Sequence, residues 1–161
     1  MTDSLRWQQH FLQLCLDHAR MSKDPSTQVG AIIVGPDREL RSSGFNGFPR
    51  GVEDSPMRLR DREMKLKLIV HAEMNAVLNA ARVGIPLKGC TLYLAATDDT
   101  GHVWGGPPCS RCVVEIIQAG ITKIVSYPPK AVPSRWHEDL MLSRLLLNEA
   151  KIEYSEITSS I

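Results

Sequence analysis

The sequence lacks long hydrophobic runs and a strong charge of either sign. Its 161 residues include no apolar stretch near the ~20 residues that a membrane-spanning helix needs. The N-terminus, MTDSLRWQQH, lacks the basic-then-apolar pattern of a signal peptide, so we expect a soluble, cytoplasmic protein without a membrane partner. The formal net charge of +1 offers little attraction for long nucleic acid and suits a small anionic substrate better.

Cysteine is scarce, and internal repeats, low-complexity segments and linkers are absent from the sequence. Two of the four cysteines are spaced C-x-x-C, which indicates a metal or redox site in a reducing compartment rather than a disulfide framework. The other two, Cys15 and Cys90, are expected in the core as small hydrophobic residues. With 43% hydrophobic and 23% charged residues, the chain fits one globular domain over residues 1–161.

Hydrophobic periodicity and turn residues predict an α/β fold. The order of elements, α-β-β-α-β-α-β-α-β, favours a three-layer sandwich in which a mixed sheet of about five strands is flanked by helices. Helices are expected to about residue 20 and over 57–67, 71–84, 110–119 and 138–150, and strands over 29–34, 40–45, 91–95, 123–126 and 152–155.

Two short motifs carry the strongest chemical signal, His71-Ala72-Glu73 and Pro108-Cys109-Ser110-Arg111-Cys112. Each is predicted at the start of a helix, where the positive end of the helix dipole lowers thiolate pKa values. Cys109 and Cys112 are three residues apart and therefore share one helix face. Together with the His71 imidazole they offer three ligands to one Zn²⁺ ion and leave a fourth position open, as in catalytic zinc sites.

Glu73 lies two residues beyond the histidine, close enough to reach a water at the open zinc position without being a ligand itself. We expect it to move protons, from the water to ring N3 of a cytosine and then to the departing amine, while hydroxide attacks C4. The combination of H-x-E with P-C-x-x-C is a known signature of zinc deaminases.

Other interpretations of these residues stay open at the level of sequence. The C-x-x-C pair alone also fits a thiol–disulfide or zinc-storage protein, although that leaves His71 and Glu73 without a role. A closed structural zinc site would take its fourth ligand from His18, His102 or His137.

With these residues in hand, the chain resembles the deoxycytidylate (dCMP) deaminase family of the cytidine deaminase superfamily over nearly its full length. The resemblance implies zinc-dependent conversion of dCMP to dUMP and ammonia, with another cytosine nucleotide, a modified dCMP or a tRNA adenosine deaminase-like activity as alternatives. It also implies a homo-oligomer, with nucleoside triphosphates as allosteric ligands. The blocks that carry it are 22–30 (SKDPSTQVG), 44–49 (GFNGFP), 71–76 (HAEMNA) and 116–121 (IIQAGI).

The resemblance also suggests substrate contacts. Asn46 would hydrogen-bond the sugar or base, and Ala72 would offer its backbone N–H to the cytosine carbonyl; an isolated Asn46-Gly47 would otherwise be an ordinary turn. A 5′-phosphate needs cationic or N–H-rich partners. The candidates, each of which also suits a solvated surface, are Lys23, Arg50, Arg135 and His137.

Residues 97–106 depart from the family pattern, because they lengthen the distance from His71 to Cys109 to 38 residues. The segment ends in Trp104-Gly105-Gly106, directly before the cysteines. We expect a lid with a glycine hinge, in which Trp104 stacks on the base and excludes water. The alternative for Trp104 is a packing or subunit-contact residue.

Overall fold

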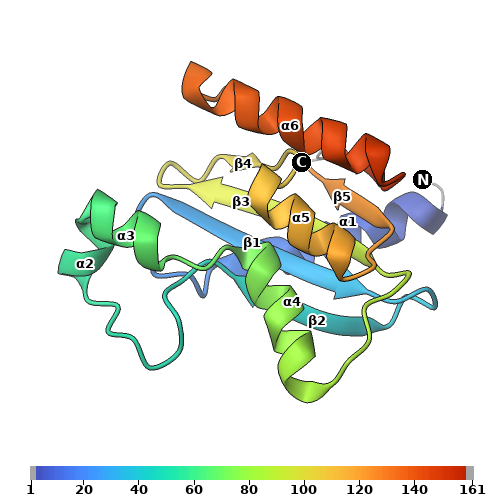
Figure 1. The fold of residues 1–161 in the computed structure, drawn as a ribbon, viewed down its shortest axis with the longest axis horizontal. Coiled ribbons are helices and arrows are strands. Elements are labelled where there is room, and N and C mark those ends of the chain that lie inside the picture. Colours follow the sequence, from blue (N-terminus) through green and yellow to red (C-terminus); the bar gives the residue numbers. More distant parts are fainter. Residues whose placement is uncertain (1–2, 159–161) are drawn as a thin grey trace.

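The computed structural model describes residues 3–158 and shows a mixed β-sheet with helices on both faces (Figure 1). The predicted three-layer α/β sandwich is therefore confirmed. The expected domain, residues 1–161, extends at both ends beyond the described residues. The strands are β1 Thr27–Val34, β2 Leu40–Phe45, β3 Thr91–Asp98, β4 Val103–Trp104, β5 Lys123–Ser126 and β6 Glu153–Glu156. The helices are α1 Asp3–Ala19, α2 Pro56–Arg60, α3 Arg62–Leu68, α4 Ala72–Val83, α5 Ser110–Gln118 and α6 His137–Glu149, with a short 3₁₀ turn at Ser134–Trp136.

The order of strands explains where the ends of the helices lie. The sheet runs β2-β1-β3-β5-β6, and β4 pairs with β3 outside this path. β1 is antiparallel to both β2 and β3, whereas β3, β5 and β6 are parallel. Parallel neighbours need a crossover, which α5 provides between β3 and β5. The start of α5 therefore lies near the C-terminal ends of these two strands.

Alternate residues of the strands face two separate cores. On one face, Phe11 and Cys15 of α1 pack with Ile32 and Tyr93. On the other, α4 and α5 cover buried residues of the same strands, among them Leu92. In Figure 1, α1 lies behind the sheet and α4, α5 and α6 lie in front of it. Cys15 and Cys90 are fully buried, so their predicted place in the core is confirmed.

Two glycines let helices approach the sheet closely. A Cβ on Gly30 would collide with the Cys15 carbonyl oxygen of α1, and a Cβ on Gly44 would collide with the Ala72 carbonyl oxygen and the Ala76 nitrogen. Any larger residue at Gly44 would therefore push away the first turn of α4, which carries the predicted metal site.

The predicted helix 57–67 is wrong in detail, because it is divided into α2 and α3 at Asp61. The backbone of Asp61 is extended, with φ −71° and ψ 103°, and its carboxylate accepts a hydrogen bond from the Met64 backbone at 3.0 Å. An aspartate that caps a new helix in this way ends the preceding one.

Residues 97–106, which the sequence placed outside the strands, mostly form a β-hairpin, so the predicted end of the strand at residue 95 is wrong. β3 continues to Asp98, and β4 pairs back onto Ala96 and Thr97. The Asp98 carboxylate accepts hydrogen bonds from the backbones of Thr100 and His102, which closes the turn. The sheet therefore has one more strand than the five expected. Among residues 3–158, no helix is long and apolar enough to cross a bilayer.

Candidate metal centre

The three predicted zinc ligands converge at the starts of α4 and α5. His71 and Cys109 are the residues that precede these helices, both with extended backbones, and Cys112 lies in the first turn of α5. His71 Nδ1 is 3.5 Å from Cys109 Sγ and 3.4 Å from Cys112 Sγ. The three ligand atoms all lie within 4.8 Å of one another.

This geometry fits a tetrahedral Zn²⁺ ion. Zn–N bonds of about 2.0 Å and Zn–S bonds of about 2.3 Å at a tetrahedral angle place nitrogen and sulfur about 3.5 Å apart, which is the separation observed. Among residues 3–158, the only cluster of this kind is His71, Cys109 and Cys112. The closed structural site with a fourth ligand from His18, His102 or His137 is therefore not formed. All four cysteines are free, so Cys109 and Cys112 are not a disulfide.

Hydrogen bonds within the metal-free cluster set the protonation of its three ligand side chains. Hydrogen bonding from the Cys112 thiol and then from His71 lowers the pKa of Cys109 to about 4, in spite of burial. The bond to Cys109 raises the pKa of His71 to about 9, and the same thiolate, with burial, raises the pKa of Cys112. The metal-free cluster at neutral pH therefore holds protons that a metal ion must displace.

Glu73 is buried beside the cluster, with 5% of its surface exposed. Burial raises the pKa of its carboxyl, the charge of His71 lowers it, and the net direction is upward. A carboxyl group whose pKa is moved towards neutrality can both accept and release protons in a reaction. Glu115 on α5 is a second carboxyl group with a pKa raised by burial, and its Oε2 atom is buried without a hydrogen-bond partner among the described residues.

The Asn-Gly segment reaches the cluster through the residue before His71. Gly47 and Val70 form an isolated β-bridge, with hydrogen bonds of 3.1 and 2.8 Å. The side chain of Asn46 bonds to β1, since it accepts from the Val29 N–H at 2.8 Å and donates to the Thr27 carbonyl at 2.9 Å. Asn46 therefore has a structural role that the sequence analysis missed, beside the substrate contact predicted for it.

The α4 helix holds Ala72 and is itself tied to the edge strand. Ala72 is fully buried and lies in the first turn, where backbone N–H groups have no partner within the helix. Asn75 and Asn79 donate to the carbonyls of Phe45 and Ser43 on β2, at 2.8 and 2.7 Å. This pair of bonds, spaced by one helical turn, ties α4, whose start carries His71 and Glu73, to β2.

The four phosphate candidates lie in different places. Lys23 pairs with Asp54 at 2.9 Å, and Arg50 donates to Asn79, about 10 Å along α4 from its start at a rise of 1.5 Å per residue. Both are exposed. Arg135 and His137 are exposed at the start of α6, which contacts the start of α5 through Asp139 and Ser110. Arg135 and His137 therefore lie within four residues of Asp139, which contacts the start of α5.

Trp104 is held by the hairpin rather than carried on a hinged lid. It lies opposite Ala96, on the face of the sheet that α4 and α5 cover. The ammonium group of Lys130 lies 4.7 Å from its ring centroid, and Trp104 Nε1 is buried without a partner among the described residues. Gly105 and Gly106 donate to the carbonyls of Pro128 and Tyr127, at 3.0 and 2.9 Å. The expected glycine hinge is wrong, because both glycines are tied to the end of β5.

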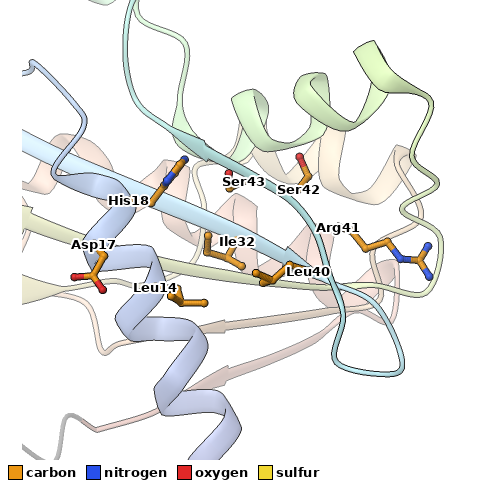
Figure 2. A pocket seen from close by; sticks show the side chains of 8 residues that line it. All are labelled: Leu14, Asp17, His18, Ile32, Leu40, Arg41, Ser42 and Ser43. Carbon is orange, nitrogen blue, oxygen red and sulfur yellow. The ribbon is translucent and has the colours of Figure 1, made fainter.

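A separate groove of about 460 Å³ lies between α1 and the edge strand β2 (Figure 2). Its walls include His18 and Asp17 on one side and Arg41 on the other. Burial lowers the pKa of His18, whose ring packs edge-on against Phe45 at 5.4 Å. None of the residues of the metal cluster lines this groove.

The His-Cys-Cys cluster, with Glu73 buried beside it, has the three protein ligands of a catalytic zinc site. The family model for the cytidine and deoxycytidylate deaminase zinc-binding region matches residues 5–127. The chain is 38% identical over 151 residues to an uncharacterized deaminase in the luxG 3′ region of Aliivibrio fischeri, which covers 92% of this chain and 91% of that protein. It is 35% identical over 162 residues to deoxycytidylate deaminase of Mus musculus, covering 97% and 82%.

The chain thus belongs to the family of zinc-dependent cytidine and deoxycytidylate deaminases, and Zn²⁺ is its cofactor. A solved structure shares its fold. The dCMP deaminase of cyanophage S-TIM5, in complex with dCMP and dUMP, superposes with a TM-score of 0.65 at 20% identity, and the match covers 98% of this chain and 99% of that one.

Proposed function

We propose that this protein converts dCMP and water to dUMP and ammonia. The observation that carries the proposal is the buried carboxyl of Glu73 beside the three-ligand cluster of His71, Cys109 and Cys112. The extended similarity to proteins named deoxycytidylate deaminase supports the choice of nucleotide. The proposal takes residues 1–161 as one deaminase domain.

In this proposal His71, Cys109 and Cys112 hold the zinc ion and Glu73 is the proton carrier. Bound Zn²⁺ supplies Lewis acidity that makes a water molecule nucleophilic at neutral pH. Glu73 takes a proton from the attacking water and gives it to ring N3, so that C4 accepts the oxygen. Glu73 then takes the proton of the new C4 hydroxyl and gives it to the exocyclic nitrogen, so that the C4–N bond breaks to release ammonia and C4 keeps the oxygen as a carbonyl.

The remaining assignments concern substrate binding. Ala72 offers its backbone N–H to the cytosine carbonyl, and Asn46 contacts the sugar or base with the hydrogen-bonding capacity that its bonds to β1 leave free. Trp104 can stack on the base with one ring face only, because Lys130 covers the other. Among the phosphate candidates, the proposal favours Arg135 and His137 over Lys23 and Arg50.

A substrate panel tests this function directly. Zinc-loaded protein would be assayed for ammonia release from dCMP, CMP, cytidine, a C5-substituted dCMP and an RNA hairpin. Highest kcat/KM for dCMP supports the proposal. Highest kcat/KM for the RNA hairpin, or for cytidine without a phosphate, would overturn it. The homo-oligomer and its regulation by nucleoside triphosphates stay predictions, which sedimentation and the same assay with added triphosphate would check.

A further inference from the structure

At the start of α5, the N-cap position is occupied by a residue of the metal cluster. Cys109 occupies the N-cap position and makes no side-chain capping hydrogen bond. Its sulfur lies 3.5 Å from His71 Nδ1 instead. The first backbone N–H groups of a helix have no partner within the helix, and a capping Ser, Thr, Asp or Asn usually satisfies one of them.

The missing cap comes from another helix. Asp139, in the first turn of α6, accepts a hydrogen bond from the Ser110 backbone N–H through Oδ2 at 3.1 Å and one from Ser110 Oγ through Oδ1 at 2.5 Å. Four residues later on the same face of α6, the fully buried Ser143 donates from Oγ to the Pro108 carbonyl at 2.6 Å.

These contacts hold both peptide planes that flank Cys109. The Pro108 carbonyl belongs to the peptide plane before Cys109, and the Ser110 N–H belongs to the plane after it. The only soft backbone rotations between the two planes are φ and ψ of Cys109. When both planes are fixed by α6, the direction of the Cys109 side chain is fixed as well.

We propose that Asp139 and Ser143 are positioning residues that aim the Cys109 sulfur at the metal ion. The hydrogen bonds of the two residues go to Ser110 and to Pro108, the neighbours of Cys109, so they act through the backbone on either side of it. The inference holds whichever cytosine nucleotide the enzyme takes. Groups that orient metal ligands typically contribute about 10- to 100-fold to metal affinity.

The test measures zinc affinity rather than activity. Zinc would be titrated into metal-free protein against a competing chelator, for wild type, Asp139→Ala and the matched control Glu138→Ala. Glu138 is an exposed acid in the same helical turn, so its loss changes the charge at the α6 terminus but leaves the Ser110 contact in place. We expect Asp139→Ala to weaken zinc binding by about 10-fold or more, with Glu138→Ala close to wild type. Equal affinity for the two variants would overturn the proposal.

Milder variants keep the test usable if Asp139→Ala does not fold. Asp139→Asn keeps one acceptor oxygen, and Ser143→Ala removes only the bond to Pro108, so each should weaken zinc binding by a smaller factor. The double variant Asp139→Asn/Ser143→Ala should weaken zinc binding further, because it weakens the hydrogen bonds to both peptide planes that flank Cys109. Variants that lower the Tm of the metal-free protein but bind zinc as tightly as wild type would show a purely structural role and contradict the proposal.

Discussion

The side-chain amide of Asn46 bridges the backbone of β1, accepting from the Val29 N–H at 2.8 Å and donating to the Thr27 carbonyl at 2.9 Å. Asn46 has only 6% of its surface exposed. The bridge links the Asn-Gly segment to the sheet, and Gly47 in turn pairs with Val70, next to His71. The side chain that we propose to contact substrate thus also links the segment beside the metal site to the sheet.

Replacing Asn46 should therefore cost stability even without substrate. Asn46→Ala leaves the Val29 N–H and the Thr27 carbonyl, both partly buried, without this partner, and loss of a partner by a fully buried group typically costs about 1–3 kcal/mol. We expect a lower free energy of unfolding in urea. Gln13→Ala, which removes an exposed hydrogen bond on α1, should change stability by no more than about 0.5 kcal/mol. Similar urea midpoints for Asn46→Ala and wild type would contradict a structural role for Asn46.

Removing one sulfur of the cluster should abolish tight zinc binding. Cys112→Ser replaces a thiolate ligand by a hydroxyl, so we expect the zinc content after dialysis to fall well below one ion per chain. Cys90→Ala is the control, since this buried cysteine lies outside the cluster. Mass spectrometry measures the zinc content per chain of both variants. Full zinc retention by Cys112→Ser would show that the ligand set is wrong.

Zinc uptake should release protons. At pH 7, the metal-free cluster holds one proton on His71, with a pKa of about 9, and one on Cys112, whose pKa is raised, while Cys109, with a pKa of about 4, is already a thiolate. Binding of Zn²⁺ needs a neutral imidazole and two thiolates. Affinity should therefore rise with pH between about 5 and 9, with about two protons released at pH 7. Calorimetry in buffers of different ionisation enthalpy measures this number; no proton release would contradict the protonation pattern.

Trp104 should affect substrate binding more than turnover. If its free ring face stacks on the base, Trp104→Ala removes on the order of 1 kcal/mol, so KM for dCMP should rise about fivefold or more. Trp7→Ala, on the opposite face of the sheet, is the control for a lost tryptophan. Steady-state kinetics distinguish the outcomes. An unchanged KM with a lower Tm would make Trp104 a packing residue of the hairpin.

The main elements of the fold were predictable because their signals are local. The apolar stripe of α1, the buried strand Thr27–Val34 and the glycine after α4 are visible in a few consecutive residues. The break at Asp61 was not predictable from the sequence. An aspartate inside an amphipathic stretch resembles a solvent-exposed residue until its hydrogen bond to the Met64 backbone is seen. The hairpin was missed because its second strand has only two residues, and it depends on long-range pairing.

The metal cluster was predictable because its ligands have diagnostic spacing on two helix starts. The supporting residues had no such signal. Asp139 looks like an ordinary first-turn acid of α6, and only the packing of α6 on α5 brings it to Ser110. The phosphate candidates could not be ranked for the same reason, since a surface arginine such as Arg50 has the same local pattern wherever its helix or loop comes to lie.

The most direct test of the account is the metallated Glu73→Gln variant. Glutamine keeps the size of the side chain and removes its ability to carry a proton. We expect one tightly bound zinc per chain, as in wild type, with kcat for ammonia release from dCMP lowered by about 10²- to 10⁴-fold. A zinc-loaded Glu73→Gln protein that deaminates dCMP at close to the wild-type rate would contradict it.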